Sequence, residues 1–286
     1  MIHYIDKKCK KCNNIFSVSL SEKSRIFCSK KCYSKHMEKS PHIRTCPSCA
    51  KKFVLKNITQ EKRYGWGKFC SRKCSKYNFN ENYFSNIDSE EKAYWLGFLF
   101  ADGNIYKNQM TLKLKQTEIS HLEKFKLALN SDHTIHNGKN YISNKSKYKN
   151  VGYYSALLIS NMQFTKDLIS LGCVPNKSLI VEFPSISYDL SRHFIRGVFD
   201  GDGCISFIKN NSKYKRFNII SGSEKFINSI KFILEKEINA SIHLRKLKGK
   251  NIFSLDTSKK NIVQSIFRFM YKDATIYLDR KYQKFL

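Results

Sequence analysis

The sequence predicts an α+β protein in which one helix-and-strand unit occurs twice, after two small cysteine-containing modules. Three observations support this prediction. An apolar run that ends in an acid and a glycine appears twice, at residues 94–105 and 194–205. Amphipathic helical segments alternate with segments of alternating apolar and polar residues, the pattern of half-buried strands. Eight of the ten cysteines fall into two similar sets near the start of the chain.

The repeated run reads YWLGFLFADGNI at residues 94–105 and FIRGVFDGDGCI at residues 194–205. Superposing the two copies aligns Asp102 with Asp202. A duplicated unit that keeps one acid at the same place in each copy predicts a pseudo-twofold arrangement, with two acids meeting on its axis. Paired carboxylates in a strongly basic chain favour metal-dependent phosphodiester chemistry.

Small residues recur one helical turn apart in each copy, as Gly97 and Ala101 and as Gly197 and Gly201. Because they carry little or no side chain, they predict two helices that pack closely through this face.

The helix ends are expected at the acids, with Gly103 and Gly203 taking a positive φ there. A helix C-terminus carries partial negative charge, so the helix dipoles and the two carboxylates both favour a divalent cation at this point. Without a cation, carboxylates held this close repel one another or share a proton.

The remaining pattern predicts a helix start at residues 88–91, with acids in its first turn. The other expected elements are helices over 120–129, 165–171, 224–237 and 262–271, and strands over 110–115, 153–159, 204–208, 216–221, 240–247 and 252–255.

The charge balance indicates a polyanionic partner. The chain has 52 Lys and Arg against 23 Asp and Glu, a formal net charge of +29, which gives salt-dependent affinity for nucleic acid. A membrane is not the expected partner, because no apolar run approaches the roughly 18 residues that span a bilayer. Residues 1–6 carry no secretory signal pattern. We therefore expect an intracellular protein, in a bacterial or phage-infected host or in an organelle or nucleus, and not a secreted one.

The eight clustered cysteines repeat one spacing. Each set has a pair separated by two residues, then a pair separated by three, and closes on Phe-Cys-Ser-basic-Lys-Cys. The sets are Cys9, Cys12, Cys28 and Cys32, and Cys46, Cys49, Cys70 and Cys74. Four thiolates at this spacing fit a tetrahedral structural zinc site.

Each set resembles a treble-clef zinc finger, which implies two structural Zn²⁺ ions. The alternative is a disulfide framework, which the absence of a secretory signal disfavours. His36 could replace one thiolate, although four cysteines are present. Cys173 and Cys204 fit small buried residues better than nucleophiles.

The two repeated runs resemble the paired motifs of LAGLIDADG homing endonucleases in their single-chain form. The stretches 171–178, 190–197 and 277–282 are also similar to the intron- and phage-encoded branch of that family, so the resemblance covers roughly residues 80–286. One departure is that the earlier acid of the motif is Phe100 in the first copy and Asp200 in the second. The family's metal-binding acids correspond to Asp102 and Asp202.

This resemblance implies two αββαββα repeats whose strands lie across the DNA duplex. The expected domains are zinc fingers at 1–40 and 41–78 and repeats at 79–180 and 181–286. Strand faces would present basic side chains to DNA, namely Lys113, Lys115, Lys209, Lys213, Lys215, Arg216, Arg245 and Lys246.

The resemblance further implies a site-specific, Mg²⁺-dependent endonuclease that acts as a monomer on double-stranded DNA. Asp102 and Asp202 would hold Mg²⁺ at the two scissile phosphates. The basic candidates for assisting catalysis are Lys115, Lys177, Arg216 and Lys281, which the sequence does not rank. Two alternatives stay open: a maturase that binds intron RNA, and a non-catalytic DNA-binding regulator.

Overall fold

The computed structural model describes residues 3–37, 43–46, 50–55, 69–71, 77–141, 151–208 and 211–286. The chain divides into two compact units, Met1–Lys76 and Tyr77–Leu286. In the described part, no helix is both long enough and apolar enough to cross a membrane.

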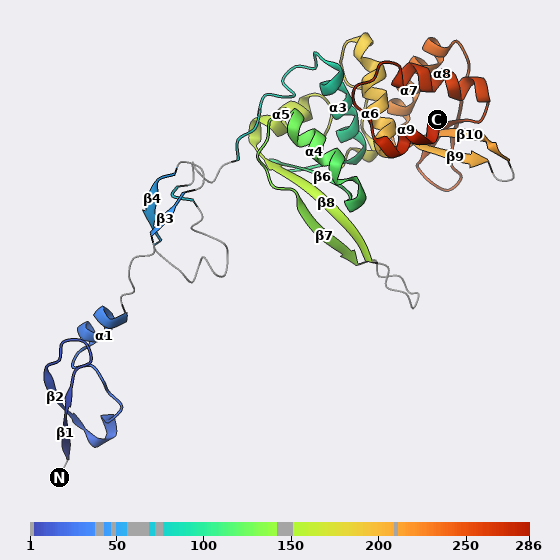
Figure 1. Ribbon diagram of the computed structural model, residues 1–286. Coiled ribbons are helices and arrows are strands. Elements are labelled where there is room, and N and C mark those ends of the chain that lie inside the picture. The colour runs from blue at the N-terminus through green and yellow to red at the C-terminus, as the bar shows by residue number, and fades with distance from the viewer. Residues whose placement is uncertain are drawn as a thin grey trace. The chain divides into compact units, whose positions relative to one another are not determined.

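The second unit repeats one order of elements, helix, two strands, helix, two strands, helix (Figure 1). The first pass consists of α3 (Glu90–Asp102), β5 (Gly103–Tyr106), β6 (Gln109–Lys115), α4 (Ile119–Ala128), β7 (His136–Tyr141), β8 (Val151–Ser160) and α5 (Met162–Ser170). The second consists of α6 (Ser191–Asp202), β9 (Cys204–Ile208), β10 (Asn211–Ser221), α7 (Glu224–Ile238), β11 (His243–Lys246), β12 (Phe253–Thr257) and α8 (Lys260–Tyr271), after which α9 (Asp279–Phe285) follows. The predicted α+β class and the twofold αββαββα order are confirmed.

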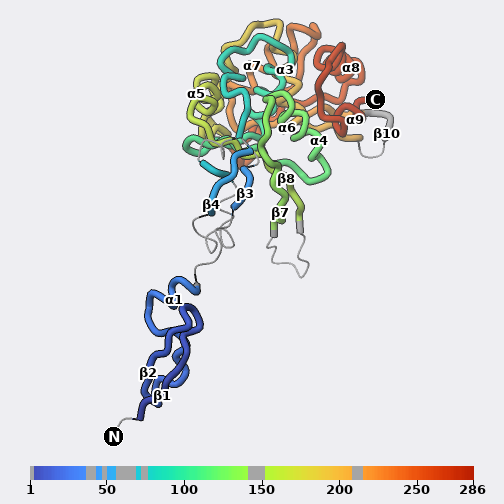
Figure 2. Tube along the Cα trace, turned by 60° about the vertical axis from the view of Figure 1, so that its left-hand side comes forward, coloured from blue at the N-terminus to red at the C-terminus, as the bar shows by residue number. Residues whose placement is uncertain are grey.

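The two sheets have the same topology. Their strand orders are β5-β6-β8-β7 and β9-β10-β12-β11, and all neighbours are antiparallel. In each, the alternation of side chains turns one face toward helices, with α4 and α5 on the first sheet and α7 and α8 on the second. The hairpin of β7 and β8 extends away from the helices in both views (Figures 1 and 2).

Helices α3 and α6 lie side by side at the centre of this unit (Figure 1). A Cβ atom placed on Gly97 would lie 2.0 Å from the carbonyl oxygen of Phe194, and one on Gly197 would lie 2.1 Å from that of Tyr94. The two backbones therefore touch at both glycines. This confirms the close packing predicted from the small residues.

The predicted positive φ at Gly103 and Gly203 is wrong. Their φ angles are −73° and −72°, and each residue continues into extended backbone. Glycine is required at both positions because a side chain would not fit. A Cβ on Gly103 would lie 2.6 Å from the carbonyl oxygen of Leu99, and one on Gly203 would lie 2.2 Å from the ring of Phe199.

Changing Gly197 to Leu is expected to lower the free energy of unfolding by about 1–3 kcal/mol, because the added side chain forces two contacting backbones apart. Urea denaturation measures the effect. Gly152→Leu is the matched control, since a Cβ there meets no atom within 4 Å. Equal stabilities for the two variants would contradict the packing argument.

The first unit contains two similar hairpins. Strands β1 (Tyr4–Lys8) and β2 (Ile15–Ser19) form the first and are followed by α1 (Lys30–Met37), while β3 (Ile43–Thr45) and β4 (Lys52–Val54) form the second. Short 3-10 turns occupy Leu20–Glu22, Gln116–Glu118, Lys177–Leu179 and Tyr188–Leu190.

Candidate functional site

Asp102 and Asp202 are the last residues of α3 and α6, and both are exposed. The close approach of the two helices continues to this point. A Cβ on Gly201 would lie 2.3 Å from the Cβ of Ala101 and 3.4 Å from Oδ2 of Asp102. The carboxylate of Asp102 therefore lies against α6, one residue before Asp202.

The protein environment makes both carboxylates reluctant to ionise. Loss of hydration, followed by the negative charge of Asp202, raises the pKa of Asp102 to about 6. Loss of hydration also raises the pKa of Asp202, although the charges of Lys281 and Lys177 act against it. A pair of acids in this state gains from a cation that would neutralise both.

Lys281 is buried at the end of α6. Its Nζ donates to the carbonyl oxygens of Phe199, Gly201 and Gly203 at 2.7, 2.8 and 2.6 Å. An ammonium group has three N–H donors, so these bonds occupy all of them. Burial lowers the pKa of Lys281 to about 8, while Asp200 and then the site acids favour its charged form. Lys281 thus holds the helix end that carries Asp202.

Lys177 occupies the corresponding place in the first repeat. Its Nζ donates to the carbonyl oxygen of Gly103, immediately after Asp102. Each motif helix is therefore followed by a glycine whose carbonyl binds a lysine supplied after the last helix of the same repeat. Of the four basic candidates from the sequence, the structure brings these two to the acids.

A cavity of about 290 Å³ opens beside the second acid. Its wall includes the polar residues Asp202, Lys177 and Asn251 and the apolar residues Phe100, Val181 and Phe226. A ligand in this cavity could therefore meet both charges: a cation bound to the ligand could approach Asp202, and an anionic group could approach Lys177.

The other two basic candidates lie on sheets. Lys115 is exposed at the last position of β6. Arg216 lies on β10, where its Nη2 is 2.9 Å from Oδ1 of Asp256. Neither side chain has a described contact with Asp102 or Asp202.

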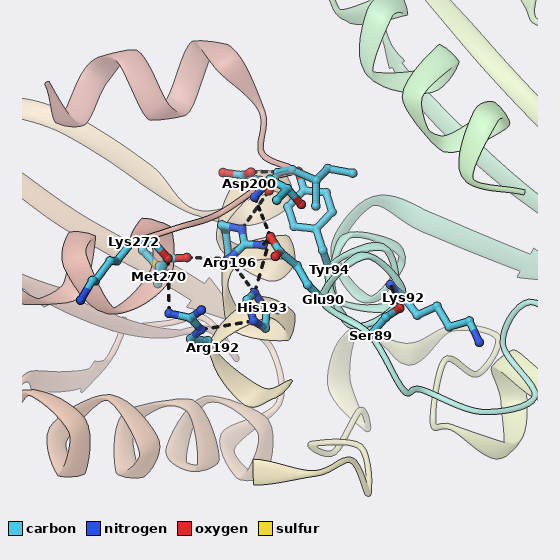
Figure 3. A network of polar contacts seen from close by, with 12 residues as sticks. Ser89, Glu90, Lys92, Tyr94, Arg192, His193, Arg196, Asp200, Met270 and Lys272 are labelled. Carbon is cyan, nitrogen blue, oxygen red and sulfur yellow. Dashed lines mark hydrogen bonds and ion pairs between the residues drawn. The ribbon is translucent and has the colours of Figure 1, made fainter. Parts of the chain in front are cut away.

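Asp200, the earlier acid of the second motif, is buried at the centre of a network rather than at the site (Figure 3). Its carboxylate accepts from the hydroxyls of Tyr94 and Tyr271 at 2.9 and 2.5 Å and from the backbone N–H of Leu278 at 2.7 Å. It therefore ties α3, α8 and the segment that leads into α9 to the motif helix α6.

Arg196 lies one turn before Asp200 and is fully buried (Figure 3). It donates to Glu90 Oε1 at 2.7 Å, and to the carbonyl oxygens of Met270 and Ile276 at 2.6 and 2.9 Å. Its Nη1 lies 2.9 Å from Nδ1 of His193. This charge is thus paired across the two repeats, between residues 106 positions apart.

The basic residues predicted to face DNA separate into groups. Lys113 and Lys115 share the outward face of the first sheet, where Lys113 Nζ donates to Asn140 Oδ1 at 2.9 Å and lies 3.6 Å from the Tyr154 ring centroid. Arg216 and Arg245 share the outward face of the second sheet through Asp256.

Two further lysines, Lys215 and Lys246, alternate with these arginines along β10 and β11 and so point to the opposite face. Lys215 Nζ donates to the carbonyl oxygen of Phe285 at 2.6 Å. Lys209 and the side chain of Lys213 lie outside the described residues.

The first cysteine set comes together in one cluster. The sulfur atoms of Cys9, Cys12, Cys28 and Cys32 all lie within 4.8 Å of one another. Sγ of Cys28 is 3.5 Å from that of Cys12 and 3.4 Å from that of Cys32. Although burial acts to raise it, N–H donors of Cys12, Cys28 and Lys11 lower the pKa of the Cys9 thiol to about 6. The cluster can hold a metal that prefers four thiolates.

The second cysteine set is described only in part, since Cys49 and Cys74 lie outside the described residues. Its turn nevertheless matches that of the first set. The N–H of Cys46 donates to the carbonyl oxygen of Lys51, and the carbonyl oxygen of Cys46 accepts from the N–H of Ala50. In the first set, Cys9 makes the same two bonds with Asn14 and Asn13. Ala50 and Asn13 both have positive φ, 56° and 63°.

Comparisons with known proteins agree with this architecture. Residues 189–268 match the family described as LAGLIDADG-like domain. The homing endonuclease I-WcaI bound to its DNA recognition sequence is similar in structure, with 14% identity, coverage of 80% of this chain and 99% of that chain, and a TM-score of 0.50. No curated protein sequence matches this chain.

Two other solved structures have lower TM-scores. The N-terminal LAGLIDADG domain of DUF199/WhiA has 15% identity and a TM-score of 0.40, with 67% of this chain and 89% of that chain covered. The meganuclease I-SmaMI bound to uncleaveable DNA has 13% identity and a TM-score of 0.44, with 68% and 87% covered. By its motif, its repeated topology and the match at residues 189–268, the chain contains a LAGLIDADG-like domain.

Proposed function

We propose that this protein is a site-specific endonuclease that hydrolyses both strands of duplex DNA with a divalent metal. The observation that carries the proposal is the pair of acids at the touching ends of α3 and α6, each beside a lysine-bound helix end. The net charge of +29 supports a nucleic-acid substrate. Two unequal repeats in one chain favour a monomer acting on a non-palindromic site.

The donor set at the helix ends fits Mg²⁺. Asp102 and Asp202 offer carboxylate oxygens, the ligands this ion prefers, and both have pKa values raised in the absence of a cation. When bound there, Mg²⁺ would supply Lewis-acid stabilisation of the negative charge that develops on the phosphate during hydrolysis.

The protein's own residues have separate tasks in this proposal. Lys177 and Lys281 fix the ends of the motif helices and add positive charge beside the acids. The sheet residues Lys113, Lys115, Arg216 and Arg245 contact DNA bases and backbone, and phosphate contacts set the register. Repeats at 79–180 and 181–286 would each contribute one acid.

The test is cleavage of a linear duplex that carries the uninterrupted allele of the presumed insertion site, with and without Mg²⁺. Two defined ends that appear only with Mg²⁺ are expected. Binding without cleavage would favour a regulator. Selective binding of the intron transcript, with its splicing accelerated, would favour a maturase. Either result would overturn the nuclease proposal.

We further propose that the chain carries two structural Zn²⁺ ions in fingers at 1–40 and 41–78. Zn–S bonds of about 2.3 Å in a tetrahedron place sulfur atoms about 3.8 Å apart, close to the spacings in the first set. The matching turn at Cys46 supports a second site of the same kind, with Cys49, Cys70 and Cys74 as its other ligands.

Metal analysis of the purified protein is expected to find two zinc ions per chain. Deletion of residues 1–76 should remove both and leave a folded nuclease, because the second unit has its own core. Affinity for DNA should fall and its salt dependence become shallower, since basic residues are lost, while the cleavage position stays the same. A zinc-free protein, or a truncated protein with unchanged affinity, would contradict this role.

A further inference from the structure

One acid lies among the basic residues on the outward face of the second sheet. Asp256 on β12 is buried and is paired with a guanidinium group from each neighbouring strand. Arg216 Nη2 is 2.9 Å from its Oδ1, and Arg245 Nε is 3.2 Å from its Oδ2. The acid lowers the charge of a face that would bind a polyanion more tightly without it, so electrostatic affinity alone does not account for it.

The strand register places the three side chains on one face. Asp256 is paired with Asn218 on β10 and with His243 on β11, while Arg245 is paired with Ser254. The hydroxyl of Ser254 donates to Asp256 Oδ2 at 3.0 Å and accepts from Asn218 Nδ2 at 2.7 Å. The carboxylate is therefore fixed by a neutral partner as well as by the two arginines.

The two arginines remain open to a ligand. Their side chains are 40% and 47% exposed, whereas that of Asp256 is 11% exposed. Nε is the Arg245 nitrogen that pairs with the acid, and its two terminal nitrogens are the donors left for a ligand. Among the described side chains, none is recorded as accepting from those nitrogens. Two parallel N–H donors match the O6 and N7 acceptors of guanine in the major groove.

We propose that Asp256 is a positioning residue that holds Arg245 as a reader of guanine in duplex DNA, with Arg216 balancing the buried charge. The inference rests on the proposed DNA-binding function and adds a specificity determinant to it. A freely rotating arginine would contact phosphates and bases alike. An arginine whose guanidinium is paired with a buried carboxylate loses fewer rotamers when it meets one base edge.

The experiment selects bound sequences from a randomised duplex library, with the full-length protein and no Mg²⁺. The variants are Asp256→Asn and Arg245→Lys, and Asp189→Asn is the control, an exposed acid outside the second sheet. The wild type and the control should enrich guanine at one position. Both test variants should lose that preference, by roughly tenfold to a hundredfold at that base pair.

Binding to a non-specific duplex separates this role from simple phosphate attraction. Asp256→Asn should keep or increase that affinity, because one negative charge is removed, and Arg245→Lys should keep it, because the charge is unchanged. If both variants bind duplex DNA and enrich the wild-type sequence, the inference fails and the proposed function stands. If the wild type binds no duplex DNA, both fail.

Discussion

Replacing Asp102 or Asp202 with Asn is expected to abolish cleavage of duplex DNA while leaving DNA binding intact. Asn keeps the size of the side chain but removes the charge that holds a divalent cation. Loss of several kcal/mol of transition-state stabilisation corresponds to a fall in rate on the order of a thousandfold. Single-turnover cleavage and equilibrium binding, measured on the same duplex, check the two halves of the prediction.

The control for this change is Asp88→Asn, which removes an exposed acid just before the start of α3, at the other end from Asp102. It should cut DNA at the wild-type rate. Undiminished cleavage by either site variant would remove that acid from the site. Weakened binding by a site variant would show that its carboxylate contributes to the DNA interface rather than to metal binding alone.

Asp102→Asn is also expected to stabilise the metal-free protein near neutral pH. The pKa of Asp102 is raised to about 6 from an ordinary 3.8, so its ionised form costs stability above pH 6. That cost disappears as the pH falls through 6 toward 4, because the folded state takes up the proton first. In EDTA, Asp102→Asn should therefore melt higher than the wild type at pH 7.5, and the difference should shrink at pH 4.5. Loss of cleavage then cannot be attributed to unfolding.

The sequence predicted those helices and strands whose apolar residues recur with helical periodicity or alternate with polar ones. The repeated motif identified α3 and α6 and their close contact, since the small residues that permit it are visible in the chain. Strand β6 shows strict alternation and was predicted within one residue. In contrast, β7 reads HNGKNY and contains no apolar alternation. Its structure comes from pairing with β8, which local sequence does not report.

The short strand β5 and helix α9 were missed for related reasons. Strand β5 begins at Gly103, where a helix-ending glycine with positive φ was expected, and has only four residues. Helix α9 reads DRKYQKF, in which a lysine is the buried residue. Burial of Lys281 depends on three carbonyl groups about 80 positions earlier in the chain, so periodicity could not predict it.

The candidate site was predicted by its acids but not by its supports. Four basic residues were candidates, and only contacts between distant segments separate Lys177 and Lys281 from Lys115 and Arg216. Asp256 was missed because one acid in a strand is ordinary. Its role depends on Arg216 and Arg245, which lie on two other strands.

Breaking the ion pair between the buried Arg196 and the partly buried Glu90, which joins the two repeats, is expected to have the largest effect on stability. Arg196→Met removes the charged partner of Glu90, which keeps the hydrogen bond from the N–H of Thr275, and it removes the donors to the carbonyl groups of Met270 and Ile276. Removing one member of a buried ion pair typically costs about 3–5 kcal/mol. Urea denaturation should show this loss, whereas Arg268→Met, at an exposed position of α8, should change stability little.

The location of the damage follows from the network. Arg196 holds the backbone at Met270 and Ile276, and Asp200 holds the next segment at Leu278, three residues before Lys281. Loss of Arg196 should therefore increase amide hydrogen exchange across residues 272–285 more than in the first sheet. If the variant is folded, its cleavage rate should also fall, because Lys281 would be displaced from the end of α6. Unchanged exchange in that segment, in a variant that is nonetheless destabilised, would show that Arg196 supports the helix interface alone and that Asp200 is sufficient to position Lys281.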